Sequence, residues 1–129
     1  MVLVDSSVWI NYFNGAVGNE TDLLDYLLQE TPILMGDLIL TEVLQGFTKD
    51  IDYRKAREIL SILPFRELGG FEVAVRSAEN YRFLRKNGVT VRKTIDIIIG
   101  TFCLINDIPL LHDDKDFTPM EKYLSLKTI

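Results

Sequence analysis

The chain alternates short, wholly apolar runs with longer segments in which apolar residues recur every three or four positions. The second pattern predicts helices, because positions i, i+3 and i+4 share one helix face. Such segments cover residues 8–13, 21–30, 37–47, 53–63, 71–86 and 94–105. The apolar run at 2–4 and the mainly apolar segment at 109–112 predict buried strands. A segment at 124–126 predicts a weaker strand, and strand edges near 33–34 and at 65 are poorly marked.

Polar residues and glycines at the segment boundaries indicate where helices begin and end. We expect Ser6 or Ser7 to cap the first helix and Thr94 to cap the last one. Strands that do not alternate with polar residues are buried on both faces, as in parallel sheets covered by helices. The sequence therefore predicts an α/β fold, a small sandwich built on short parallel strands.

Length and composition limit the class of protein. A chain of 129 residues fits a single domain over residues 1–129, and the 47% share of hydrophobic residues excludes a disordered protein. One cysteine cannot form an internal disulfide, which favours a reducing, cytoplasmic setting. The start of the chain does not read as a signal peptide, and no apolar run reaches the ~18 residues that a membrane span needs. The net charge of −5 argues against nucleic-acid binding through bulk charge alone.

Carboxylates stand in apolar surroundings, where an isolated charge costs several kcal/mol. They follow the first strand, interrupt two apolar helical segments and follow the strand at 109–112, at Asp5, Glu42, Asp96, Asp113, Asp114 and Asp116. A hard divalent cation, Mg²⁺ or Mn²⁺, suits such oxygen ligands. Because parallel strands end at one edge of a sheet, Asp5 and Asp114 can share a site.

Each acid also has an ordinary structural explanation. Asp5 can cap a helix, Asp96 can complement a helix dipole, Glu42 can face solvent, and residues 113–116 can form an acidic turn. A shared site is favoured because all of these explanations would otherwise have to hold together.

Four segments resemble, in order, the motifs of PIN-domain ribonucleases, particularly the VapC-type toxins of bacterial toxin–antitoxin modules. They are VLVDSSVWI at 2–10, TEVLQG at 41–46, KTIDIIIG at 93–100 and LLHDDKDF at 110–117. Each motif alone is weak, but the four together span the chain. The resemblance implies a three-layer α/β/α fold, one PIN-like nuclease domain, and endoribonuclease activity with Mg²⁺ or Mn²⁺. It also implies a homodimer and a small antitoxin partner.

The same resemblance assigns roles to the acids. Asp5, Glu42, Asp96 and Asp114 match the acidic quartet of the family, which we take as the catalytic residues, and Asp116 matches a frequent extra acid. We expect the metal ligands to be Asp5, Asp96 and Asp114, with Asp116 as an additional candidate. Glu42 can hold the metal's water, hold a second ion or act as a base.

His112 is a departure from the family pattern. The family usually has Thr or Ser at this position, and the missing hydroxyl leaves Ser6 or Ser7 as possible substitutes. As the only histidine in the chain, His112 excludes mechanisms that need two histidines, and packing at a strand end is the simpler explanation of its presence.

Basic residues gather in an acid-free stretch just before Asp96. Arg82, Arg85, Arg92 and Lys93 can contact RNA phosphates there, and with Ser6 they are our candidates for substrate binding. The alternative is a solvated basic helix end, which also suits the helix dipole.

Two glycines stand four residues after acids, Gly46 after Glu42 and Gly100 after Asp96. Helical side chains lean toward the N-terminus, so a larger residue at either position would cover the carboxylate. The glycines either leave room for metal, water or phosphate, or they allow close helix packing.

Two other functions compete with a nuclease. One is a PIN-like module that binds a partner without cutting, although the intact acidic quartet argues against it. The other is a receiver-like phosphoacceptor domain, which needs an acidic pair after the first strand. Here Asp5 is followed by Ser6 and Ser7, so that fit is poor.

Overall fold

A four-stranded parallel sheet forms the centre of the computed structural model, which describes all 129 residues. The strands lie in the order β3-β2-β1-β4 and comprise β1 (Val2–Val4), β2 (Ile33–Gly36), β3 (Phe65–Arg66) and β4 (Leu110–Leu111). Leu3 of β1 pairs with Leu34 on one side and Leu110 on the other. The residues of β1, β2 and β4 are all buried, as their unbroken apolar runs predict.

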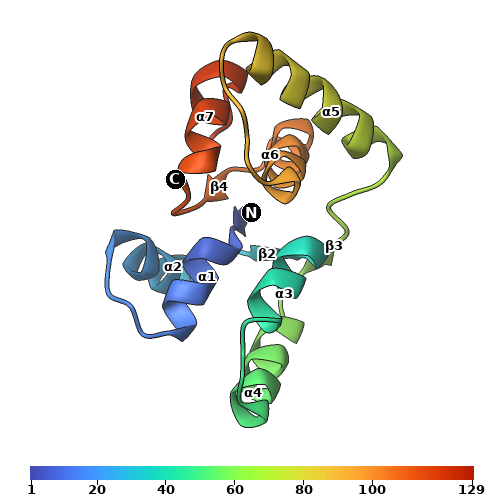
Figure 1. Ribbon diagram of the computed structural model, residues 1–129. Helices are drawn as coiled ribbons and strands as arrows, with labels where there is room; N and C mark the ends of the chain where they lie inside the picture. The colour runs from blue at the N-terminus through green and yellow to red at the C-terminus, as the bar shows by residue number, and fades with distance from the viewer.

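Two groups of helices cover the sheet (Figure 1). They are α1 (Ser6–Phe13), α2 (Asn19–Glu30), α3 (Asp37–Leu44) and α4 (Asp50–Ser61) on one side, and α5 (Phe71–Lys86), α6 (Thr94–Asn106) and α7 (Thr118–Leu124) on the other, with a 3₁₀ turn η1 (Lys115–Phe117) before α7. The predicted three-layer α/β/α sandwich is therefore confirmed. No helix combines the length and the apolar character needed to cross a membrane.

The C-terminal region differs from the prediction. Residues 124–126 do not form a strand, because α7 ends at Leu124 and Ser125 turns the chain with a left-handed φ of 60°. The sheet is instead extended by a single parallel bridge between Leu110 and Thr128. Pro119 suits the first turn of α7, where a missing N–H leaves no hydrogen bond unmade.

Two helix caps also differ from the prediction. Asp5 caps α1 in place of Ser6 or Ser7, since its Oδ2 accepts the amide hydrogen of Ser7 at 3.0 Å. Lys93, and not Thr94, is the cap residue of α6, and its side chain makes no capping hydrogen bond. One carboxylate oxygen of Asp5 and the whole Lys93 ammonium group are thus left for other partners.

The ladder between β1 and β4 continues one residue beyond β1. The amide of Asp5 donates to the carbonyl of Leu111 at 2.9 Å. This bond places the Asp5 carboxylate beside the loop that leaves β4, at the carboxyl edge of the sheet.

Candidate active site

Three carboxylates from two distant segments meet at this edge. Asp96 in the first turn of α6 and Asp114 and Asp116 after β4 offer oxygen atoms that lie within 4.8 Å of one another. We call these residues the acidic trio. Asp5 lies outside the trio but close enough for its charge to act on Asp96 and Asp114. The structure thus brings together three of the four predicted metal ligands and places the fourth, Asp5, within reach of their charges.

Ser7 joins Asp5 to the loop after β4. Its hydroxyl donates to Asp5 Oδ2 at 2.6 Å and accepts the amide hydrogen of Asp113 at 3.0 Å. Burial raises the pKa of Asp5, although the hydrogen bonds from Ser7 oppose this effect. The sequence pointed to Ser7 only as a cap or a spare hydroxyl, because its contact with Asp113 depends on the pairing of β1 with β4.

Glu42 reaches the site from α3 through Ser6. The Ser6 hydroxyl donates to Glu42 Oε1 at 3.0 Å. Burial raises the pKa of Glu42, the Ser6 hydrogen bond opposes the rise, and repulsion by Asp5 adds to it. Ser6 therefore holds an acid of the site, and its contact with substrate stays a prediction.

Lys93 and Arg92 pair with the acidic trio. Lys93 Nζ lies 3.0 Å from Asp114 Oδ2 and 3.5 Å from Asp96 Oδ2, and Arg92 Nε lies 3.4 Å from Asp116 Oδ1. Burial acts to raise the pKa of Asp114, but hydrogen bonds from the Asp116 amide and from Lys93 outweigh burial and lower it. Two residues predicted to bind RNA phosphates thus contact acids of the site.

Asp96 is the most strongly perturbed acid. Its side chain is only 2% exposed, and burial raises its pKa to about 7 against the opposing charge of Lys93. Repulsion by Asp114 and Asp5 adds to the rise.

Several carboxylate oxygens of the site are buried without a hydrogen-bond donor. They are Asp5 Oδ1, Asp96 Oδ2 and Asp116 Oδ2. Buried polar atoms are nearly always satisfied in folded proteins, and hard divalent cations satisfy carboxylate oxygens. The donor set therefore fits Mg²⁺ or Mn²⁺.

Comparison with known proteins identifies the family. The PIN domain matches residues 2–122. The chain belongs to the PIN-domain family. This assignment confirms the resemblance found in the sequence and removes the receiver-like alternative.

Individual PIN-domain relatives cover nearly the whole chain. It is 26% identical over 129 residues to the VapC ribonuclease Mb1587 of Mycobacterium bovis and to the ribonuclease VapC11 of Mycobacterium tuberculosis, with 98% of this chain and 96% of each relative covered. The enzyme class of these relatives agrees with the one expected from the sequence.

Solved structures share the fold. VapBC2 from Rickettsia felis, bound to a DNA fragment from its promoter, matches with a TM-score of 0.79 at 15% identity over 100% of this chain and 98% of that chain. VapBC-1 from nontypeable Haemophilus influenzae matches with a TM-score of 0.73 at 18% identity over 100% of this chain and 97% of that chain.

In this PIN domain, His112 lies under the loop that carries Asp114. Its Nδ1 accepts the amide hydrogen of Asp114 at 3.2 Å, and its ring centroid lies 4.9 Å from that of Phe117. Nε2 faces Glu121 Oε1 at 3.7 Å, a partner that the sequence did not single out. An imidazole nitrogen therefore supplies an acceptor to the loop that carries Asp114, at the position where the family usually has a hydroxyl.

Arg82 and Arg85 lie apart from the acidic trio of this PIN domain. They line a hollow of about 540 Å³ between α5 and the start of α6, and the Arg85 guanidinium lies 5.6 Å from the centre of the Tyr81 ring. No ion pair or hydrogen bond joins either arginine to the trio. The basic stretch is thus divided between two surfaces.

The two glycines have different surroundings. A Cβ atom at Gly100 would lie 2.4 Å from Sδ of Met120, so this glycine makes room for the buried Met120 side chain of α7. A Cβ atom at Gly46 would meet only the backbone oxygen of Val43, at 3.5 Å. Close packing, and not room for a ligand, therefore explains Gly100.

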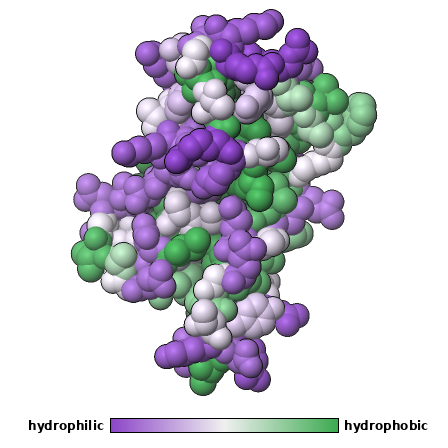
Figure 2. Space-filling model, in the orientation of Figure 1, coloured by the Kyte–Doolittle hydropathy of each residue, from purple (hydrophilic) through white to green (hydrophobic).

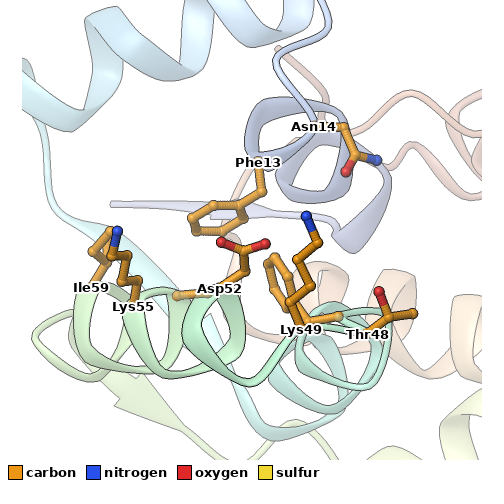
Figure 3. A pocket seen from close by; sticks show the side chains of 10 residues that line it. Phe13, Asn14, Thr48, Lys49, Asp52, Lys55 and Ile59 are labelled. Atoms are coloured by element: carbon orange, nitrogen blue, oxygen red, sulfur yellow. The ribbon is translucent and has the colours of Figure 1, made fainter.

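A second hollow, of about 430 Å³, lies in the other helix layer, between the end of α1 and the start of α4 (Figure 3). Phe13 and Ile59 contribute apolar surface, and Asp52 lies among Lys49 and Lys55. It holds a single carboxylate, so it lacks the cluster of acids found at the acidic trio.

Proposed function

We propose that this PIN domain is a metal-dependent endoribonuclease, the toxin of a type II toxin–antitoxin system acting in the cytoplasm, with residues 1–129 as one nuclease domain. The observation that carries the proposal is the acidic trio, two of whose carboxylate oxygens are buried and accept no hydrogen bond. The names of the relatives, VapC ribonucleases, support RNA as the substrate.

The carboxylates of Asp96, Asp114 and Asp116 would hold Mg²⁺ or Mn²⁺, with Asp5 as a further ligand. Such an ion, when bound, activates water and stabilises the charge that develops on a phosphate undergoing in-line attack. The Ser7 hydroxyl fixes the orientation of Asp5, because it donates a hydrogen bond to the Asp5 carboxylate and accepts one from the amide of Asp113. Ser6 holds Glu42, whose raised pKa suits a group that accepts a proton from water.

A nuclease assay on defined RNAs with the full chain tests this function. Asp5→Asn and Asp96→Asn should each lower kcat at least ~10²-fold, the scale of losing one key electrostatic stabiliser. Glu58→Gln, an exposed acid on α4, is the matched control and should cut at the parental rate. Full activity in EDTA, or in both site variants, would refute the proposal and leave a PIN-like binding module.

The proposed protein partner is a small antitoxin. The structural neighbours are VapBC complexes, and the hollow beside α1 and α4 offers apolar surface with charged residues around it, which suits a peptide segment. An antitoxin produced with this chain should elute with it in size-exclusion chromatography and block cleavage.

We also propose a homodimer. Figure 2 shows an apolar patch at the upper right, over the start of α5, where Phe71 is 88% exposed and Val75 is 42% exposed. Contiguous exposed apolar patches are typical of interfaces. Analytical ultracentrifugation should show a dimer for the parent chain and a weaker monomer–dimer association for Phe71→Ser.

A further inference from the structure

We infer that the Lys93 ammonium group takes the place of the divalent cation when the metal is absent, and that metal binding displaces it. The inference rests on the proposed metal-dependent function, because it concerns the same carboxylates. It gives Lys93 a role before RNA arrives, in addition to the phosphate contact predicted from the sequence.

The contacts of Lys93 are those of a bridging cation. Its Nζ lies 3.0 Å from Asp114 Oδ2 and 3.5 Å from Asp96 Oδ2, so one charge serves two members of the acidic trio. Asp96 Oδ2 is buried and has no hydrogen-bond partner. A divalent ion bound to these two oxygens would bring two cations into contact, so the ammonium group and the metal exclude each other there.

Lys93 is also free to leave. It is the cap residue of α6 but makes no capping hydrogen bond, and its side chain is 53% exposed. A four-carbon stem lets the ammonium group swing into solvent without moving the backbone. The two acids are less free to move. Asp96 is part of α6, and the carboxylate of Asp114 accepts a hydrogen bond from the amide of Asp116.

Arg92 provides a built-in comparison. It pairs with the same trio, but only through Asp116 Oδ1 at 3.4 Å, and its side chain is 77% exposed. Neutralising Arg92 removes a positive charge from the neighbourhood and leaves the bridge between Asp96 and Asp114 in place. A general field effect and a competition for the same oxygens can therefore be told apart.

Displacement would link the metal to the substrate. The released ammonium group stays tethered at the start of α6, beside the site, where an RNA phosphate is a suitable new partner. Because coupling between ligands is reciprocal, metal should strengthen RNA binding and RNA should strengthen metal binding.

Calorimetric titration of the full chain with Mn²⁺, without RNA, tests the inference. Lys93→Met keeps the length of the side chain and removes the charge, and it should bind Mn²⁺ about five- to tenfold more tightly, the scale of a charge-assisted contact shared by two carboxylates. Lys93→Arg should stay near the parent, and Arg92→Gln should change the affinity by less than about twofold.

Thermal melting separates competition from support of the fold. In EDTA, Lys93→Met should melt below the parent, because two acids lose their counter-ion, and saturating Mn²⁺ should close the gap. The inference would be overturned if Lys93→Met melted below the parent by the same amount in EDTA and in saturating Mn²⁺. It would also be overturned if this variant bound Mn²⁺ no more tightly than the parent. If all variants bind Mn²⁺ equally and the parent still cuts RNA, only this inference fails. If no variant binds Mn²⁺, the proposed metal site fails as well.

Discussion

At the scale of single residues, Asp96 links the stability of the fold to the chemistry of the site. Its pKa of about 7 in the folded chain, against the ordinary value of 3.8, means that folding favours the protonated form. The stability that this group contributes is fully present below pH 3.8 and is lost as pH rises through about 7. Near neutral pH, without metal, the Asp96 charge therefore opposes folding.

We predict that Asp96→Asn is at least as stable as the parent in EDTA at neutral pH. Relative to the variant, the parent should lose stability between about pH 4 and pH 7, since only the parent must bury a new charge. Thermal melting across this pH range in EDTA measures the difference.

Metal should reverse the order of stability. A ligand that binds only the folded state at 100 times its Kd stabilises it by about 2.7 kcal/mol, and the parent should gain far more than the variant. If Asp96→Asn is strongly destabilised in EDTA and keeps the metal response of the parent, Asp96 is only a helix-start residue.

His112 gives a second prediction at this scale. His112→Asn can keep an acceptor near the position of Nδ1 for the Asp114 amide, whereas His112→Leu cannot. The Leu variant should bind Mn²⁺ about fivefold more weakly, since a missing hydrogen bond costs about 1 kcal/mol, and the Asn variant should stay near the parent. Equal Mn²⁺ affinities in the two variants would show that the Nδ1 hydrogen bond does not position the loop.

At the scale of helices and strands, the sequence predicts those elements whose packing depends mainly on their own residues. The boundaries of α5 match the prediction of 71–86, and β1 and β4 appear as apolar runs. α7 was missed because Met120 is its only buried residue, so it shows no apolar stripe. β3 has two exposed residues and exists only because β2 provides its hydrogen-bonding partner.

The packing of the Met120 side chain of α7 against Gly100 of α6 gives a prediction at this scale. Gly100→Ala should destabilise the protein by about 1–3 kcal/mol, because the buried Met120 must move to admit the new methyl group. Gly46→Ala is the matched control and should be neutral or stabilising by up to about 1 kcal/mol, since ordinary contact distances remain. Chemical denaturation measures both. Unchanged stability with abolished cleavage in Gly100→Ala would restore the interpretation that this glycine leaves room for a ligand.

At the scale of the whole molecule, the topology explains which parts of the site were predictable. Asp5 and Asp114 were expected to meet because parallel strands end at one edge, and β1 does pair with β4. The pairing of Lys93 with the acidic trio, and of Ser7 with Asp113, was not foreseen. Both depend on how two loops lie against each other, which no repeat of apolar residues encodes.

Charge distribution gives a prediction for the whole surface. In a chain of net charge −5, binding of the proposed RNA substrate would depend on local groups, and the basic stretch is divided between the site and the hollow beside α5. Neutralising Arg92 and Lys93 together should make the slope of log affinity for RNA against log salt concentration less steep, by up to ~0.7 for each phosphate contact that is lost. Neutralising Arg82 and Arg85 should change the slope less. Binding of an uncleavable RNA in Mg²⁺ at several salt concentrations measures both slopes. A larger effect of neutralising Arg82 and Arg85 would indicate that RNA binds mainly along α5.

The pairing of β1 with β4 also governs when the proposed activity can arise. During synthesis β1 is made well before β4 and the acids that follow β4. A nascent chain on the ribosome therefore carries Asp5, Glu42 and Asp96 without Asp114 or Asp116, and its acidic trio is incomplete. Long-range parallel pairing is also slow to form. The proposed metal site is thus completed only after β4 and the acids that follow it have been made and have joined β1.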